Sequence, residues 1–235
     1  MTPATSPRIA VAILAAGESR RLGEPKALCE LPGGKPILRL INEVRRSSCN
    51  THALEVADAL GTDSAEKCRP IVVTGAHHES IATALSTAGE DARPYAEGGQ
   101  VLFNANWQLG RTSSIQLAAH TSPGRDLLVI PVDHPRITCE MINQLVDSWV
   151  ANGSPRCGWL APFVIGTSGE RRFGHPLLIG RELILELLEW PPVTPLRELR
   201  HLAAPLLALE VDCESILDNL DTPQALEEIR KMDQK

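Results

Sequence analysis

The chain has 235 residues, a formal net charge of −6 and 43% hydrophobic residues. This length can bury the core of one α/β domain, and the acidic balance argues against a broad basic face for nucleic acid or an anionic membrane. No basic stretch followed by a long apolar one opens the chain, so we expect no signal peptide and no membrane span. The six cysteines form no C-x-x-C pair, which favours reduced thiols and a cytoplasmic location.

Apolar segments typical of buried strands alternate with amphipathic helical patterns along the chain. Helix starts carry residues that favour the first turn, such as Pro36 and the N-cap candidate Thr138. In chain order, the predicted elements are a strand at Ile9–Leu14, a helix at Pro36–Arg46, a strand at Ile71–Thr74, helices at Glu79–Ser86 and Ser113–His120, a strand at Leu127–Pro131, a helix at Thr138–Val150, a strand at Trp159–Phe163, a helix at Arg181–Trp190, a strand at Leu206–Val211 and a helix at Thr222–Ile229.

This alternation predicts an α/β fold with a mainly parallel, mixed sheet and helices on both faces. We predict a single domain over residues 1–235, with a candidate insertion at 47–69, where a polar, alanine-rich segment delays the second strand. Thr167–Arg172 predicts a hairpin tip. Ligands of such sheets lie beyond the carboxyl ends of the strands, so the residues that follow each strand are the candidates for a site.

The segment after the first strand reads LAAGESRRLGEPKAL. Ala15, Ala16 and Gly17 are small enough for backbone N–H groups to approach a ligand closely. Arg21 and Lys26 supply positive charge for a polyphosphate, the arginine as a planar fork and the lysine as a point charge. The segment matches neither G-x-x-x-x-G-K-[ST] nor G-x-G-x-x-G. It predicts a phosphate-binding loop, with a solvated basic turn as the alternative.

This segment resembles the signature of nucleotidyltransferases of the molybdenum cofactor guanylyl- and cytidylyltransferase type, the MobA-like family. The resemblance covers nearly the whole chain and implies the nucleotide-diphospho-sugar transferase fold. It implies that the loop wraps a nucleoside triphosphate, with Arg21 and Lys26 on its phosphates. Leu-Ala-Ala-Gly, in place of Leu-Ala-Gly-Gly, is more similar to the cytidylyl branch, so CTP is the expected nucleotide. The loop positions implied to bind it also include Leu14, Ala15, Ala16 and Gly17.

Two aspartates are candidates for a metal site. Asp133 follows the strand Leu127–Pro131, where a carboxylate can hold Mg²⁺ against phosphate oxygens, or can cap a turn. The surrounding sequence resembles the family's P-x-D-x-P stretch, which implies that Asp133 is a metal ligand. Asp221-Thr222-Pro223 resembles the family's D-T-P ending and implies Asp221 as a second ligand, while capping of the last helix by Asp221 or Thr222 is the alternative. The resemblance implies Mg²⁺, with Mn²⁺ as a substitute.

Two further segments resemble the nucleotide side of the family's site. Asn104 begins a match to N-x-x-W-x-x-G-x-x-x-S, which implies that Ser113 and Ser114 line the nucleotide. Ser113 can instead, or also, cap the helix that follows, because a helix N-terminus favours bound anions. Gly75 follows the second strand, in the loop that approaches the base in the family.

The acceptor side is marked by Gly174-His175-Pro176, which resembles the G-[HN]-P stretch of the cytidylyl branch. The resemblance implies a contact between His175 and the acceptor's phosphate, and a structural turn is the alternative. The branch continues with an R-G-D-x-G-A-like loop, whereas this chain reads Pro-Leu-Arg-Glu-Leu over residues 195–199.

These features together imply a Mg²⁺-dependent nucleotidyltransferase that moves a nucleoside monophosphate from CTP to a phosphorylated acceptor and releases pyrophosphate. Molybdopterin is the implied acceptor, and a molybdoenzyme or its chaperone an implied partner; we expect no nucleic acid and no membrane. A sugar-phosphate or alditol-phosphate nucleotidyltransferase is an alternative within the fold. A non-catalytic nucleotide-binding or cofactor-insertion partner is another, and a Rossmann oxidoreductase is disfavoured by the missing glycine fingerprint.

Overall fold

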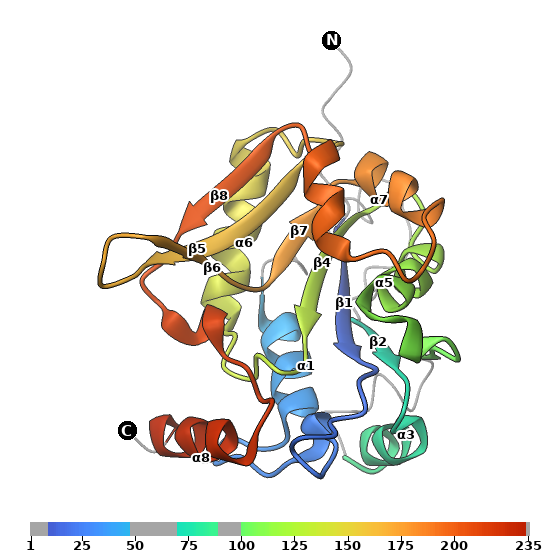
Figure 1. Ribbon diagram of the computed structural model, residues 1–235, viewed down its shortest axis with the longest axis vertical. Coiled ribbons are helices and arrows are strands. Elements are labelled where there is room, and N and C mark those ends of the chain that lie inside the picture. Colours follow the sequence, from blue (N-terminus) through green and yellow to red (C-terminus); the bar gives the residue numbers. More distant parts are fainter. Residues whose placement is uncertain (1–8, 48–69, 89–99, 234–235) are drawn as a thin grey trace.

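The computed structural model describes residues 9–47, 70–88 and 100–233. Within them the chain forms an 8-stranded sheet in the order β3-β2-β1-β4-β7-β5-β6, with β8 paired to β5 (Figure 1). The strands are β1 Ile9–Ala15, β2 Ile71–Thr74, β3 Val101–Phe103, β4 Asp126–Pro131, β5 Trp159–Ile165, β6 Arg171–Phe173, β7 Leu177–Ile179 and β8 Leu206–Glu210.

Most neighbouring strands of the sheet are parallel. Strands β1 to β4 pair in parallel, and so do β5 and β8. Strand β7 is antiparallel to both β4 and β5, and β6 is antiparallel to β5. The predicted α/β fold with a mainly parallel, mixed sheet is therefore confirmed. Strands β3, β6 and β7 were not predicted, because a three-residue strand is too short to show a periodicity of its own.

The helices form where the sequence places an apolar stripe, with small differences at their ends. The predicted hairpin tip is confirmed, since β5 and β6 pair around residues 166–170. The last helix runs three residues further than predicted, to Met232. The helices are α1 Pro36–Arg46, α3 His78–Thr87, α5 Arg111–His120, α6 Cys139–Ala151, α7 Arg181–Leu188 and α8 Pro223–Met232, and the short 3₁₀ helices are η1 Lys26–Leu28, η3 Trp107–Leu109, η4 Leu196–Leu202 and η5 Glu214–Leu217.

Helices cover both faces of the sheet, so the strands are buried on both sides (Figure 1). Val11 and Ile13 of β1 join the core beneath α1, α3 and α6. Ala12 and Leu14 point to the opposite face and join the core beneath α5 and α7. This alternation follows from the two-residue period of a strand. It explains why the predicted strands are nearly continuous apolar runs.

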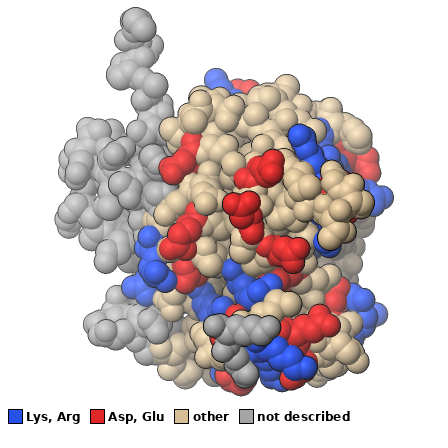
Figure 2. Space-filling model, turned by 90° about the vertical axis from the view of Figure 1, so that its left-hand side faces the viewer, with Lys and Arg blue, Asp and Glu red and all other residues tan. Residues whose placement is uncertain are grey.

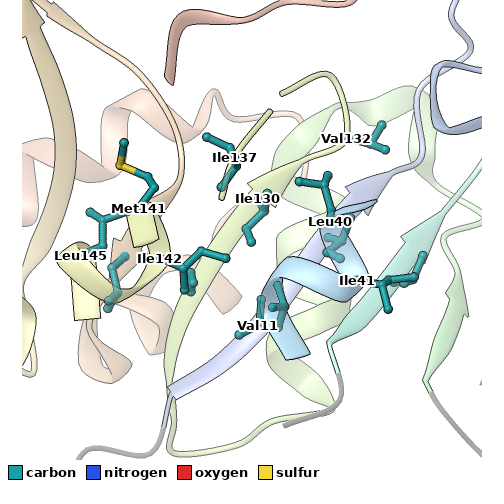
Figure 3. Close-up of a cluster of buried hydrophobic side chains, with 14 of the residues drawn as sticks. Val11, Leu40, Ile41, Ile130, Val132, Ile137, Met141, Ile142 and Leu145 are labelled. Atoms are coloured by element: carbon teal, nitrogen blue, oxygen red, sulfur yellow. The ribbon is translucent and has the colours of Figure 1, made fainter. Parts of the chain in front are cut away.

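Helix α1 illustrates how the sequence fixes one of these layers. Pro36 occupies its first turn, and Ile37, Leu40, Ile41 and Val44 form a fully buried face with helical spacing. Figure 3 shows two of these side chains from α1 packed over β1 and β4. Each large aliphatic side chain buried in this way contributes about 1.5–3 kcal/mol to folding. The face of α1 therefore anchors the segment that leads out of the loop after β1.

A small third core connects α8 to the loop after β1. Leu22 and Leu31 from that side of the chain pack with Leu226 and Ile229 of α8. The guanidinium Nε of Arg230 donates a hydrogen bond to the Glu30 carbonyl at 3.0 Å. The C-terminal helix thus supports a loop that is distant in sequence.

Asp126 ties two helices to the start of β4. Its side chain is 1% exposed and accepts hydrogen bonds from Trp149 Nε1 at 2.9 Å and from the Arg181 backbone N–H at 2.9 Å. Asp126→Ala leaves these donors unpaired and is expected to lower the free energy of unfolding by about 3 kcal/mol. Urea unfolding measures the loss. The exposed Asp147→Ala is the matched control, and equal losses in both variants would contradict the anchoring role.

No helix in the described part of the chain is long and apolar enough to cross a membrane. On the face in Figure 2, Lys and Arg side chains lie interspersed with Asp and Glu side chains. The candidate insertion at 47–69 lies outside the described residues except for Ser47, which ends α1 with its backbone N–H on the Val44 carbonyl. The single-domain prediction remains a prediction.

Candidate active site

A cavity of about 310 Å³ opens at the carboxyl ends of β1 and β4. It lies there because parallel strands end at the same edge of the sheet, as the topology of such folds predicts. Its walls come from the loop after β1, the start of α3, the turn before α5 and the residues after β4. The lining residues are Leu14, Ala15, Ala16, Gly17, Ser19, Pro25, Lys26, Ala27, His77, Ile81, Trp107, Gly110, Arg111, Ser114, Pro131, Val132 and Asp133.

The loop after β1 folds back on itself around Ser19. The backbone of Ser19 is left-handed, with φ of +57°, and its carbonyl accepts from the N–H groups of Leu22 and Gly23 at 3.0 and 3.1 Å. Gly23 is also left-handed, at +82°, a conformation that glycine adopts without strain. The Ser19 hydroxyl then accepts from the Lys26 backbone N–H at 3.1 Å. These local contacts bring Lys26 to the cavity wall, a role of Ser19 that the sequence analysis did not assign.

Lys26 lies between the two predicted metal ligands. Its ammonium is hydrogen-bonded to Asp221 and is 3.8 Å from Asp133 Oδ2. Arg21 Nη2 reaches the other oxygen of Asp221 at 2.5 Å. The side chains of Lys26 and Asp133 are 16% and 18% exposed, whereas that of Arg21 is 68% exposed. The structure therefore brings together all four charged residues that the sequence analysis selected.

The segment before α8 carries Asp221 to this position. The Leu220 backbone N–H donates to the Asp133 carbonyl at 3.1 Å, which joins the two segments directly. Thr222 Oγ1 accepts from the Ala225 N–H at 3.2 Å and caps α8. Of the two capping candidates, Thr222 is therefore the cap, and the carboxylate of Asp221 contacts the cations instead.

Both carboxylates are ionised at neutral pH. Burial raises the pKa of Asp133, but the hydrogen bond from His134 Nδ1 at 2.8 Å and the charges of Lys26 and Arg111 outweigh it and lower that pKa to about 2. Burial also raises the pKa of Asp221, but the hydrogen bond and charge of Lys26 bring it below its usual value. Ionised carboxylate oxygens are ligands that Mg²⁺ and Mn²⁺ prefer. Asp133 and Asp221 thus fit a hard divalent cation.

The buried side chain of Asn104 is hydrogen-bonded to two serines in the first turn of α5. It is 4% exposed, and its amide donates to Ser113 Oγ at 2.9 Å and to Ser114 Oγ at 3.0 Å. The alternative in which Ser113 caps the helix is excluded: α5 begins at Arg111, its N-cap is Gly110, and the Ser113 hydroxyl donates to the Gly110 carbonyl at 2.8 Å. Gly110 has a φ of +111°, which the tight entry to the helix requires. Ser114 lines the cavity, and Ser113 is buried behind it.

Gly75 holds two walls of the cavity close together and does not itself line it. A Cβ at Gly75 would lie 2.4 Å from the Ala16 carbonyl oxygen and 2.6 Å from Trp107 Cβ. The predicted contact of Gly75 with the nucleotide remains a prediction. Trp107 and His77 do line the cavity, and His77 Nε2 is 2.9 Å from the Glu18 carbonyl oxygen. The sequence did not assign His77 to the cavity, because its position there depends on how β2 packs beside β1.

His175 lies in the short connection between β6 and β7, two strands that both pair with β5. Its backbone N–H donates to the Ile216 carbonyl at 3.0 Å, and its ring meets the edge of the His134 ring at 4.7 Å between centroids. Arg111 Nη1 is 3.1 Å from His175 Nε2. Burial, helped by His134 and Arg111, lowers the pKa of His175 to about 3, so the imidazole is neutral. His175 does not line the cavity but contacts Arg111, which does, and its predicted contact with the acceptor's phosphate remains a prediction.

Residues 11–209 match the family model of the MobA-like NTP transferase domain. No curated protein matches the sequence at a significant level. Among solved structures, Rv0371c of Mycobacterium tuberculosis H37Rv aligns with a TM-score of 0.65 and 20% identity, covering 97% of this chain and 99% of that one. A manganese complex of Rv0371c aligns with a TM-score of 0.59 and 18% identity, covering 95% and 98% of the two chains.

Two other structures share the fold. The synthetase of CMP-2-keto-3-deoxy-manno-octonic acid, complexed with CTP, aligns with a TM-score of 0.65 and 14% identity, over 96% of this chain and 98% of that one. The molybdopterin-guanine dinucleotide biosynthesis protein A of Archaeoglobus fulgidus aligns with a TM-score of 0.58 and 16% identity, over 96% and 98%. The family match spans most of the chain and includes the loop after β1 and Asp133. The chain therefore belongs to the MobA-like NTP transferase family and is a nucleotidyltransferase.

Proposed function

We propose that this nucleotidyltransferase moves a cytidylyl group from CTP to a phosphorylated small molecule, with molybdopterin as the first candidate acceptor. The observation that carries the proposal is the cluster of Arg21 and Lys26 with two ionised carboxylates: Lys26 and Asp133 line the cavity, and Asp221 joins Lys26 to Arg21. Cations suit the triphosphate, and carboxylates suit a divalent metal that bridges phosphates. Molybdopterin is favoured by the motif resemblance and by the fold shared with a molybdopterin-guanine dinucleotide biosynthesis protein.

The reaction is an in-line displacement at the α-phosphorus. An oxygen of the acceptor's phosphate forms a bond to the α-phosphorus, the bond from that phosphorus to the β-bridging oxygen breaks, and pyrophosphate leaves. A phosphate dianion brings no proton to remove, so the site needs no strong general base. Catalysis then rests on positioning and on neutralising charge. Lys26, held by Ser19, and Arg21 bind the phosphates of the nucleotide.

Asp133 and Asp221 would hold the divalent cation, Mg²⁺ by preference and Mn²⁺ as a substitute, which neutralises negative charge on the phosphate oxygens when bound. The manganese complex of Rv0371c, which has the same fold, supports a divalent metal. CTP is supported by the Leu-Ala-Ala-Gly sequence at the start of the loop. A CTP complex of a synthetase with this fold also supports it.

Pyrophosphate release tests the proposal directly. The purified chain is incubated with CTP, GTP, ATP or UTP and Mg²⁺, each with molybdopterin, a hexose 1-phosphate or an alditol phosphate. We expect CTP with molybdopterin to give a kcat/KM at least about tenfold above any other pair, the margin that one well-placed group can supply. EDTA should abolish release, and added Mg²⁺ should restore it.

Other outcomes would replace the proposal with a specific alternative. Faster release with a sugar or alditol phosphate would assign the chain to that class of nucleotidyltransferase. Tight binding of a nucleotide without release in any combination would contradict transfer to these acceptors and favour a nucleotide-binding partner in cofactor insertion. A Lys26→Ala control establishes that any release measured comes from this cavity.

A further inference from the structure

Arg111 is a cation of the cavity that the family motifs leave without a role. It is the first residue of α5 and lines the cavity beside Asp133 and Ser114. Unlike Arg21 and Lys26, which both contact Asp221, it forms no ion pair with a carboxylate of the described residues. A guanidinium without an acidic partner at the wall of a cavity is available to an anion.

The contact with His175 shows how Arg111 is held. A guanidinium can only donate, so His175 Nε2 accepts from Arg111 Nη1 over 3.1 Å, which places the ring's proton on Nδ1. This Nδ1 is buried and has no hydrogen-bond partner. His175 therefore orients the arginine without neutralising it. One of the guanidinium's N–H donors is engaged with His175, and its remaining donors can form a bidentate contact with a phosphate.

Arg111 and Lys26 reach the cavity from opposite faces of the sheet. Ala27, next to Lys26, belongs to the core beneath α1, whereas Ile115 of α5 belongs to the core on the other face. Asp133 follows β4 between them, and the charges of both Lys26 and Arg111 act on its carboxylate. The N-terminal turn of α5 adds a further preference for an anion on the Arg111 side. The cavity thus has two separate cationic walls around one carboxylate.

We propose that Arg111, oriented by His175, binds the phosphate monoester of the acceptor, while Arg21 and Lys26 bind the nucleotide. This inference rests on the proposed nucleotidyl transfer and names the group that selects the acceptor. In that reaction the phosphate oxygen held near Arg111 forms the new bond to the α-phosphorus, and pyrophosphate leaves on the Lys26 side. His175 acts through Arg111, so it is a positioning residue and does not itself contact the acceptor.

A binding experiment tests this division without knowledge of the natural acceptor. The protein is loaded with Mg²⁺ and the non-transferring analogue α,β-methylene-CTP, then titrated with phenyl phosphate in a calorimeter, with phenol as the uncharged probe. We expect phenyl phosphate to bind and phenol not to bind. Arg111→Met should lower the affinity for phenyl phosphate by about tenfold or more, because it removes a charge-assisted contact. The affinity for the CTP analogue should stay within about threefold in the variant, because the proposal assigns Arg111 to the acceptor and leaves the nucleotide's phosphates to Arg21 and Lys26.

Two controls separate orientation and charge from general damage. Arg125→Met removes an exposed arginine from the opposite end of β4 and should leave both affinities unchanged. His175→Gln keeps an oxygen that can accept from Arg111 and should retain binding of phenyl phosphate. His175→Leu cannot accept and should weaken this binding about as much as Arg111→Met, within roughly threefold.

Three results would overturn the inference: no binding of phenyl phosphate to the loaded wild-type protein, a loss confined to the CTP analogue in Arg111→Met, or equal binding in His175→Gln and His175→Leu. The second would make Arg111 a nucleotide ligand. Failure of the proposed function is distinguishable from these. In that case no pyrophosphate is released with any acceptor, yet phenyl phosphate still binds and still depends on Arg111.

Discussion

Lys26→Ala should lower kcat/KM for nucleotidyl transfer by about a thousandfold, the loss expected when a preorganised charge at a phosphoryl-transfer site is removed. The ammonium of Lys26 is the most buried cation of the cavity and faces both Asp133 and Asp221. Its removal takes away the positive charge on the nucleotide's phosphates. It also leaves two carboxylates without the cation between them. Steady-state pyrophosphate release with CTP and Mg²⁺ measures the effect.

Lys231→Ala is the matched control for that variant. Lys231 is 69% exposed on α8 and faces Glu227 at 4.0 Å, so its loss should change neither rate nor stability noticeably. Lys26→Ala is also examined by urea unfolding, because an unfolded variant would imitate a catalytic loss. Turnover within a few-fold of wild type in folded Lys26→Ala would contradict the mechanism.

The residues around the nucleotide phosphates can be predicted from sequence because they are encoded locally. Arg21 and Lys26 lie in one short segment, whose reversal depends on Ser19 and Gly23 within the same segment. Asp133 is found in the same way, since it ends a long apolar run whose strand character is plain. In both places, neighbouring residues decide the backbone, and the parallel sheet brings the two strand ends together.

Contacts that depend on distant packing could not be predicted in this way. The family resemblance selected His175, but its partner Arg111 is 64 residues away in sequence and comes from another element. Strand β7 is recognised only when β4 and β5 lie on either side of it. Asp221 reaches Lys26 because the Leu220 N–H bonds to Asp133, so its carboxylate contacts that cation while Thr222 caps α8, and its role as a metal ligand remains a prediction. These contacts form only when distant segments pack together, so no local sequence pattern predicts them.

Asp133→Asn should lower kcat/KM by about a thousandfold and raise the Mg²⁺ concentration for half-maximal activity by about tenfold. The amide has the shape of the carboxylate and its oxygen can still accept from His134 Nδ1, so the local hydrogen bond survives. The substitution removes the negative charge of one of the two carboxylates that fit a divalent cation. The exposed Asp147→Asn has the same chemistry on α6 and should match wild type in both measurements. An unchanged Mg²⁺ requirement in Asp133→Asn would contradict its role as a ligand.

The same titration applied to Asp221→Asn decides what the second carboxylate does. If Asp221 binds the metal, the Mg²⁺ requirement rises as it does in Asp133→Asn. If it only holds Arg21 and Lys26 in place, the Mg²⁺ requirement stays constant and the KM for CTP changes, because those cations lose their common partner. The charges of both Lys26 and Arg111 act on Asp133, whereas Asp221 interacts with Lys26 and Arg21, the two cations assigned to the nucleotide. Under the metal mechanism, a variant of Asp133 therefore impairs both substrates, and a variant of Asp221 impairs chiefly the nucleotide.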